Sequence, residues 1–311
     1  MENPSKTKIW LAQFRANFLL LAIVLVLIGL ALAIKTDIAN PPSVNAINVI
    51  LLFLGGILSH SSVNLFNEYF DFKSKIDFNT IRNPFSGGSG MLPAGLTKPG
   101  SVLAASIITL FLSAAIGIYF MLVSHWSILI LMLLGAFAIL FYNIFLVKIL
   151  MGELFAGLTL GTLMVICTYV ALVGRPDMLL SELYTAKVIL IAIPPGILTS
   201  LLLLLNEFPD VEADKQGGRY HLVIKFGRKG ASYIYAVSLI VIYGIIILLP
   251  ILSFASFWIY ISLLTIPLAF KASMTAIKFG DIMEKIVPAL GINVIVVLAT
   301  DLLMAISIFL S

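Results

Sequence analysis

Charged residues are scarce in this chain of 311 residues: Asp, Glu, Lys and Arg make up 11% of it, whereas hydrophobic residues make up 61%. A soluble domain carries roughly a quarter of charged residues, so this composition excludes an ordinary soluble globular protein. Cysteine is almost absent, and the single Cys167 lies within an apolar run. One cysteine excludes an internal disulfide and any metal site built from several thiolates.

The sequence instead contains a series of continuous apolar runs. Runs of about 20 residues predict membrane-spanning helices, whereas a transmembrane barrel would show short segments of alternating polarity. We therefore predict an all-α, polytopic membrane protein that forms a single transmembrane domain over residues 1–311. About nine spans are expected, near residues 16–34, 46–70, 101–123, 126–147, 151–173, 187–206, 230–250, 253–270 and 286–310.

Basic residues are distributed unevenly between the loops that join these spans. All but three of the 19 Lys and Arg residues fall in the N-terminal segment and in alternate loops, and the exceptions are Lys35, Arg175 and Lys187. Cytoplasmic loops carry such an excess of basic residues. We expect an integral protein of a prokaryotic cell membrane, with the N-terminus and two polar active-site loops, about 71–100 and 207–229, in the cytoplasm and the C-terminus outside. The net charge of +4 requires no nucleic-acid partner, because membrane lipid and an anionic substrate account for it.

Two acidic segments interrupt the apolar sequence at corresponding places. The first reads Asn-Glu-Tyr-Phe-Asp over 67–71 and continues to Asp77, and the second reads Asn-Glu-Phe-Pro-Asp over 206–210 and continues to Asp214. They follow the second and the sixth predicted spans, so both lie on the same side of the membrane. This repetition predicts two parallel four-helix halves with one additional helix.

The spacing within the first segment places its polar groups close together. Asn67 and Asp71 are four residues apart and share one face of a helix. Asp77 follows six residues later, about 240° around the helix from Asp71. The chain must therefore leave the helix after Asp71 if Asp77 is to join the same site.

The second segment has a similar pattern. Asn206, Asp210 and Asp214 are spaced for one helix face, although Pro209 is expected to perturb the helix there. Oxygen ligands of this kind suit Mg²⁺, which is usually held by a few carboxylates together with the phosphates of a substrate. Basic residues follow both segments and would bind the phosphate oxygens, so the sequence predicts a site for magnesium and a diphosphate.

In these motifs the chain resembles the UbiA-type intramembrane prenyltransferase superfamily. That family carries an Asn-x-x-x-Asp motif with a further Asp after the second span, and an Asp-x-x-x-Asp motif after the sixth. The spacing to Asp77, the loop at 82–90 and the pair Gly152-Glu153 resemble the menaquinone branch, which prenylates dihydroxynaphthoate. Archaeal members that attach an isoprenoid to a glycerol ether share much of the pattern. The resemblance implies a Mg²⁺-dependent enzyme that moves an isoprenyl group from its diphosphate to an aromatic or lipid acceptor and releases diphosphate.

The resemblance also implies roles for individual residues. The ligands of Mg²⁺ would be Asn67, Asp71, Asp77, Asp210 and Asp214. The residues that bind substrate would be Arg15, Asn67, Lys73, Arg82, Lys148 and Asn206. The groups that act in catalysis would be Asp71, Asp210, Tyr142 and Lys148. Aromatic faces would stabilise an allyl cation, and the candidates are Tyr69, Phe70 and Tyr142.

Three polar residues of the predicted spans lie outside the two acidic segments. Glu153 fits either an acceptor site or an interfacial position near Lys148, and His60 fits either a functional group or a packed, hydrogen-bonded side chain. Asp301 lies in the ninth span, away from the acidic segments, and we expect it to form a hydrogen bond between helices. The alternative function is a transporter or channel with a duplicated acidic cation site, but no charged path across the membrane is evident in the sequence.

Overall fold

The computed structural model describes residues 5–38 and 43–311, and within these ranges it contains helices and no strand. The long passes of the chain are α2 (Leu19–Ile34), α3 (Ala46–Lys73), α5 (Pro99–Val123), α6 (Ile128–Phe141), α7 (Gly152–Gly157) with the π-helical turn η3 (Leu158–Thr162) and α8 (Leu163–Val173), α10 (Ala186–Asn206), α12 (Leu222–Ile251), η4 (Phe257–Thr265) with α13 (Ile266–Phe279), and α14 (Met283–Leu310). The short helices are α1 (Lys6–Gln13), η1 (Ala16–Phe18), α4 (Ile76–Asn79), η2 (Leu146–Lys148), α9 (Leu180–Leu183) and α11 (Val211–Gln216).

Eight helices in the described part of the chain are long and apolar enough to cross a membrane. The predicted span at 126–147 is the exception, because α6 has only 14 residues. Such a helix is about 21 Å long, less than the hydrocarbon thickness of about 30 Å. One predicted boundary was displaced, because the span expected at 253–270 covers Phe257–Phe279. Helix α12 begins at Leu222, but Gly227, with φ of 69° and ψ of 165°, interrupts it, so its continuous part begins close to the predicted residue 230.

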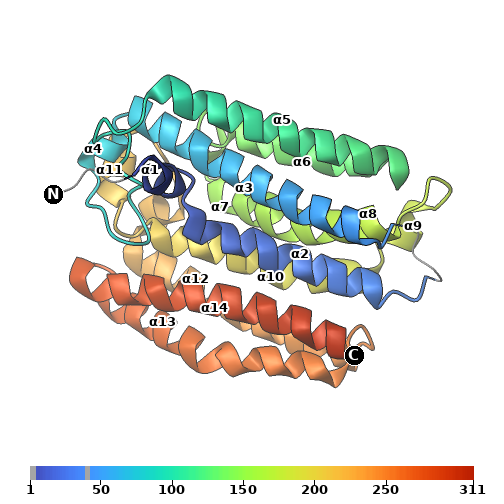
Figure 1. Ribbon diagram of the computed structural model, residues 1–311. Helices are drawn as coiled ribbons and strands as arrows, with labels where there is room; N and C mark the ends of the chain where they lie inside the picture. Colours follow the sequence, from blue (N-terminus) through green and yellow to red (C-terminus); the bar gives the residue numbers. More distant parts are fainter. Residues whose placement is uncertain (1–4, 39–42) are drawn as a thin grey trace.

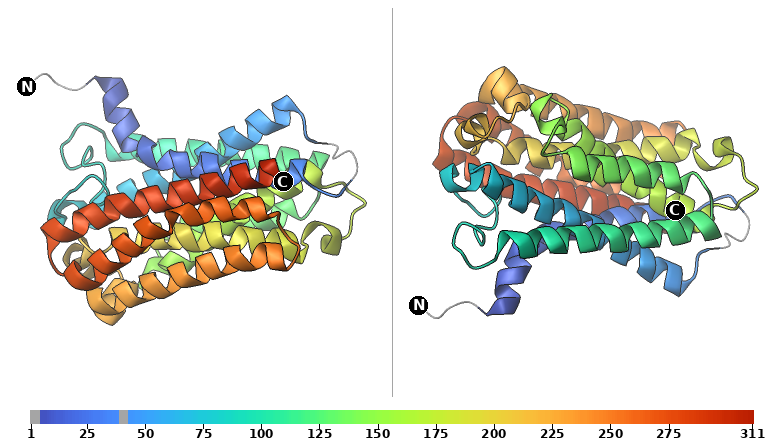
Figure 2. Two further views of the ribbon diagram at one scale, coloured as in Figure 1. Left: turned by 90° about the horizontal axis from the view of Figure 1, so that it is seen from below. Right: turned by 90° about the horizontal axis from the view of Figure 1, so that it is seen from above.

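The long helices lie side by side in a bundle, with α1 near one end and the C-terminus at the other (Figure 1). Both α3 and α10 run toward the N-terminal end, so the two acidic segments that follow them meet there. Figure 2 shows that α1 projects away from the bundle at this same end. The described chain thus begins near one end of the bundle and finishes at the other, which agrees with an odd number of passes.

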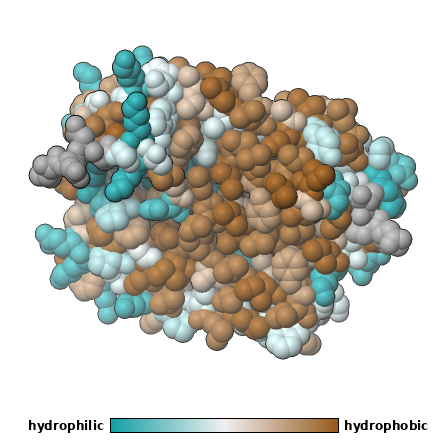
Figure 3. Space-filling model, in the orientation of Figure 1, coloured by the Kyte–Doolittle hydropathy of each residue, from teal (hydrophilic) through white to brown (hydrophobic). Residues whose placement is uncertain are grey.

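The surface of the bundle has the polarity of a membrane protein. Large apolar side chains are exposed around its middle, whereas polar residues gather at the two ends (Figure 3). Ile50, Phe111, Ile240 and Leu264 are each more than 60% exposed. Lipid chains would cover these side chains, because a contiguous apolar surface of this extent is costly in water.

Small and polar residues join the helices inside the bundle. A methyl group on Gly161 would lie 2.6 Å from the Cα atom of Gly196, so η3 and α10 approach backbone to backbone. Asn293 of α14 donates to the Leu201 carbonyl of α10 over 3.1 Å. The hydrogen bond expected from Asp301 is not formed: within the described residues neither of its buried carboxylate oxygens has a partner.

Candidate active site

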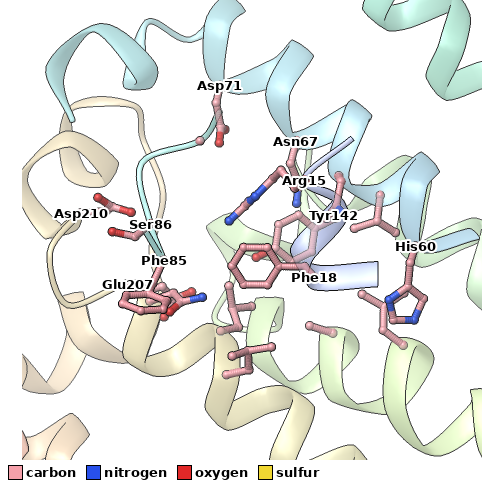
Figure 4. A pocket seen from close by; sticks show the side chains of 18 of the residues that line it. Arg15, Phe18, His60, Asn67, Asp71, Phe85, Ser86, Tyr142, Glu207 and Asp210 are labelled. Atoms are coloured by element: carbon pink, nitrogen blue, oxygen red, sulfur yellow. The ribbon is translucent and has the colours of Figure 1, made fainter. Parts of the chain in front are cut away.

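A polar cavity opens at the end of the bundle where the two acidic segments meet. Its empty space, including the open mouth, is about 1260 Å³. Asp71 and Asp77 line it from one half of the chain, and Asp210 and Asp214 line it from the other. Figure 4 shows Asp71 and Asp210 on different walls, with Arg15 pointing into the space between them. The structure therefore brings together the two motifs that the sequence placed on one side of the membrane.

The first segment reaches the cavity by reversing the direction of the chain. Helix α3 continues through Asp71 and ends at Lys73, and Lys75 then adopts a left-handed conformation with φ of 64°. The short helix α4 follows and places Asp77, which is 3% exposed, back in the cavity wall. The expected departure from the helix after Asp71 is thus present.

The second segment is not one continuous helix. Helix α10 ends at Asn206, a turn contains Pro209, and α11 begins after Asp210. Proline has no backbone N–H to continue the hydrogen bonds of α10, and its ring clashes with the preceding turn. The perturbation expected at Pro209 is therefore present, and Asn206, Asp210 and Asp214 all line the cavity without sharing one continuous helix.

Arg219, which the sequence analysis did not select, connects the two segments. Its guanidinium donates to Asp71 Oδ1, and its Nη1 donates to Asp214 Oδ1 over 2.9 Å. The three side chains are 16%, 18% and 2% exposed, so this is a largely buried ion cluster. Gly218, with φ of 78°, turns the chain after α11 and allows the Arg219 N–H to reach the Asp214 carbonyl at 2.9 Å. A basic residue directly after the pair Gly217-Gly218 was the sequence signal that could have identified Arg219.

Two asparagines extend this network. Asn143 Oδ1 accepts a hydrogen bond from Arg219 over 3.3 Å, and Asn143 Nδ2 donates to Asn67 Oδ1 over 2.7 Å. Asn67 therefore connects to the ion cluster through a neighbour that follows α6. Helix α6 ends at Phe141, and the turn after it places Tyr142 in the cavity lining and Asn143 beside Arg219.

Several oxygens in the cavity have the properties of cation ligands. Asp77 Oδ2, Asn206 Oδ1 and Asp210 Oδ1 are buried and have no hydrogen-bond partner in the described residues. Burial, with the neighbouring Asp71, raises the pKa of Asp77 to about 8, and burial, with the neighbouring Asp214, raises the pKa of Asp210 to about 7. A divalent cation would satisfy these oxygens and reduce the repulsion between the carboxylates. The residues present thus fit Mg²⁺.

The other predicted site residues divide into two groups. Arg15, Asn67 and Tyr142 line the cavity, and the Arg15 guanidinium lies 4.6 Å from the centre of the Phe18 ring. Those outside the cavity lining are Lys73, Arg82 and Lys148. Lys73 and Lys148 are exposed at the polar end of the bundle. Arg82 instead donates to the Asp77 carbonyl over 2.9 Å, which holds the loop after α4.

The aromatic walls differ from those expected. Tyr69 and Phe70 do not line the cavity, and the Lys73 ammonium lies 5.9 Å from the Tyr69 ring. Tyr69 is two residues from both Asn67 and Asp71, about 200° around the helix, so it faces away from them. The aromatic residues that join Tyr142 in the lining are Phe18, Phe85 and Phe155.

A buried carboxylate holds the loop over the cavity. Glu68 is 2% exposed and accepts hydrogen bonds from the Ser89 N–H over 2.7 Å and from Gln13 Nε2 over 2.9 Å. The loop passes close to Asp77 at Gly88, where φ is 67° and an added methyl group would lie 2.9 Å from Asp77 Oδ1. Glu68 therefore fixes the loop and α1 rather than offering a free ligand.

Beyond the acidic end, a second cavity is predominantly apolar. It lies between α3, α5, α6 and α8, and its empty space is about 910 Å³. Three residues line both cavities, namely Ile139, Thr159 and Leu160. His60 lines the polar cavity near this junction, and its Nε2 atom has no hydrogen-bond partner in the described residues.

Comparison with known proteins gives matches over most of the chain. The model of the UbiA prenyltransferase family matches residues 22–285. The 1,4-dihydroxy-2-naphthoate octaprenyltransferase of Bacillus subtilis (strain 168) is 32% identical over 231 residues, which are 70% of this chain and 68% of that protein.

Solved structures share the fold at low sequence identity. The apo structure of a UbiA homologue from Aeropyrum pernix K1 is 14% identical, with a TM-score of 0.71 over 94% of this chain and 98% of that one. A UbiA homologue from Archaeoglobus fulgidus, bound to DMAPP and Mg²⁺, is also 14% identical, with a TM-score of 0.53 over 96% of this chain and 99% of that one. The arrangement of helices is thus common to all three chains.

Proposed function

The chain belongs to the UbiA prenyltransferase family, and we propose that it transfers an isoprenyl group from its diphosphate to an aromatic acceptor of the dihydroxynaphthoate type. The observation that carries this proposal is the single cavity lined by both acidic motifs. Asp71 and Asp214, from different halves of the chain, share Arg219 there. The naphthoate-prenylating relative supports the choice of acceptor.

The polar cavity would hold the diphosphate. Asp77, Asp210 and Asn206 offer free oxygens for Mg²⁺, and Arg15 and Arg219 offer cationic donors for phosphate oxygens. The bound UbiA homologue with DMAPP and Mg²⁺ supports this assignment. When bound, Mg²⁺ supplies charge stabilisation for the leaving diphosphate.

The reacting carbon would lie at the boundary between the polar and the apolar cavity. There the C–O bond would break and its electron pair would leave with the diphosphate. The allyl carbon would then bond to a ring carbon of the acceptor, and the group which that carbon carried, a proton or a carboxyl lost as carbon dioxide, would leave and restore the aromatic ring. Phe18, Phe85 and Tyr142 present aromatic faces that can stabilise the developing cation. The loops at 71–100 and 207–229 would exclude water from this position.

The isoprenoid tail would occupy the apolar cavity between α3, α5, α6 and α8. This cavity adjoins the polar one at Ile139, Thr159 and Leu160, so a substrate with a charged head and an apolar tail fits across both. The basic residues beside the polar cavity support a cytoplasmic position for the diphosphate.

A transporter would require polar groups across the bundle. In the described residues, the acidic clusters instead lie at one end, and Asp301 is buried without a partner in α14. This distribution favours an enzyme with one polar site over a membrane-crossing path.

Asp210→Asn tests the enzyme proposal directly. The variant keeps the side-chain size but removes a charge from the cation site, so prenyl transfer should fall by orders of magnitude, whereas Asp301→Asn should retain most activity. EDTA should abolish activity of the unmodified protein and Mg²⁺ should restore it. An active Asp210→Asn variant, or activity unaffected by EDTA, would contradict the proposed role of the carboxylates.

A separate acceptor screen tests the substrate. Dihydroxynaphthoate, hydroxybenzoate, homogentisate and geranylgeranylglyceryl phosphate would each be offered with an isoprenyl diphosphate, and products would be detected by mass. Prenylated dihydroxynaphthoate is expected. Transfer to the glycerol ether alone would show a lipid-forming enzyme instead.

A further inference from the structure

A second group of buried ligand atoms lies beside the diphosphate cavity. It consists of Glu153, Glu207 and His221, which can each offer one atom within 4.8 Å of the others. All three side chains are buried, being 3%, 5% and 1% exposed respectively. Of these residues only Glu207 lines the polar cavity, so the group is adjacent to the proposed Mg²⁺ site and includes none of its proposed ligands.

Each member has an atom without a hydrogen-bond partner in the described residues. These atoms are Glu153 Oε2, Glu207 Oε2 and His221 Nδ1. Buried polar atoms are almost always satisfied, so three orphaned atoms in one group indicate a missing partner.

The distances suit a small cation. His221 Nδ1 and Glu207 Oε2 are 3.4 Å apart, too far for a good hydrogen bond. Two ligands at about 2.0–2.2 Å from a tetrahedral zinc ion are separated by roughly 3.3–3.6 Å. The observed separation therefore matches two ligands of one metal.

The other nitrogen of the His221 ring has the partner that a metal-binding histidine requires. His221 Nε2 lies 3.2 Å from Asp214 Oδ2. A cation on Nδ1 would leave the ring proton on Nε2, where it donates to the Asp214 carboxylate. Histidine ligands commonly have such an outer carboxylate, which fixes the orientation of the ring.

We propose that Glu153, Glu207 and His221 bind a divalent transition-metal ion of the Zn²⁺ type, separate from the Mg²⁺ that accompanies the diphosphate. Two carboxylates balance the charge of the dication, and the imidazole favours a transition metal over Mg²⁺. The ion would tie together the start of α7, the end of α10 and the start of α12. Through His221 it would also orient Asp214.

The test uses the full-length protein in detergent. After chelator treatment it would be loaded with Zn²⁺ in the presence of excess Mg²⁺ and desalted, and the retained zinc would be measured by mass spectrometry. One zinc per chain is expected. X-ray absorption at the zinc edge should show nitrogen and oxygen ligands at about 2.0–2.2 Å.

Variants of the group should lose the zinc. Glu153→Gln retains an oxygen that can accept the Leu222 N–H, now bonded over 2.7 Å, but loses the ligand charge. Glu207→Gln likewise keeps the size of its side chain but loses the charge of the ligand. His221→Gln retains a side-chain N–H donor for Asp214 but removes the Nδ1 ligand.

Two further variants separate this site from other carboxylates. Glu212→Gln changes an exposed acid on the same loop, and Asp210→Asn changes the proposed Mg²⁺ site, so both should retain one zinc. The proposal is overturned if the unmodified protein retains no zinc, because Glu153 and Glu207 would then share only a proton. It is also overturned if Asp210→Asn loses the zinc and the group variants keep it. Variants that do not fold leave the absorption spectrum of the unmodified protein as the deciding measurement.

Discussion

Replacing Arg219 by Gln should destabilise the metal-free protein strongly. Arg219 is the cation that two largely buried carboxylates share, Asp71 at 18% exposure and Asp214 at 2%. Removing one partner of a buried ion pair typically costs about 3–5 kcal/mol, because the remaining charge stays buried without compensation. This corresponds to a decrease in Tm on the order of 10 °C.

The charge of Arg219 also controls the protonation of Asp214. Burial alone would raise the pKa of Asp214, but Arg219 and His221 hold it below its usual value. A carboxyl with a lowered folded-state pKa stabilises the fold above its unfolded pKa of about 3.9, and this contribution is lost as the pH falls through the folded value. In Arg219→Gln the pKa of Asp214 should rise, so the loss of stability on acidification should begin at a higher pH.

Thermal unfolding in detergent with EDTA measures this effect, and Lys215→Gln is the matched control. Lys215 forms an ion pair with Glu212 at 3.6 Å in the same region, but their side chains are 49% and 73% exposed. Such surface pairs contribute about 0–1 kcal/mol, so the control should melt close to the unmodified protein. Mg²⁺ should reduce the difference in Tm between Arg219→Gln and the unmodified protein, since a dication replaces the missing charge.

Equal melting of Arg219→Gln and the unmodified protein in EDTA would refute this reasoning. The two carboxylates would then not depend on the guanidinium. If Mg²⁺ leaves the difference in Tm unchanged, the cation does not bind beside Asp71 and Asp214.

Three other measurements probe the cavities and the loops. Gly135→Phe should shorten the isoprenoid that is accepted, because a side chain at Gly135 meets no atom within 4 Å and extends into the apolar cavity. Gly244→Phe is equally unobstructed but lies outside the cavity, so it should leave the accepted length unchanged. The masses of the products measure both effects. The metal-free protein should melt higher at about pH 6 than at about pH 9, because Asp77 with its raised pKa of about 8 keeps a proton in the folded state, and Asp77→Asn should weaken this dependence. Hydrogen exchange in 71–100 and 207–229 should slow when a non-cleavable diphosphate and Mg²⁺ are added, and unchanged exchange would argue against closure of these loops.

Local sequence patterns predicted much of this molecule. Apolar runs were sufficient to predict most of the membrane-spanning helices, because a helix that crosses lipid must be both long and apolar. The repeated acidic segments identified the polar end of the bundle and four carboxylates of the cavity. The position of Tyr69, facing away from the cavity, was also within reach of sequence reasoning, since residues two apart on a helix lie on nearly opposite faces.

Contacts between distant segments were not predictable in this way. The end of α6 at Phe141 lies inside an apolar run, so hydropathy gave no signal that the chain turns there. Arg219 is 148 residues from Asp71, and their contact depends on the turn at Gly218 and on the packing of α11 beside α4. Glu153, Glu207 and His221 likewise come from three separate elements, and only folding brings them together.

Asp214 connects these separately formed parts of the site. One of its oxygens accepts from Arg219 at 2.9 Å, and the other lies 3.2 Å from His221. Both oxygens are therefore engaged, whereas Asp77 and Asp210 each keep a free one. For Asp214 to bind a cation, one of its contacts must open. The Arg219 side chain retains 16% exposure and adjoins the cavity, while His221 is fully buried, so Arg219 is the partner that an incoming diphosphate can draw away. The free oxygens of Asp77 and Asp210 would therefore be the ones available to Mg²⁺, and Asp214 would be available to it only if a phosphate oxygen replaced its carboxylate on Arg219.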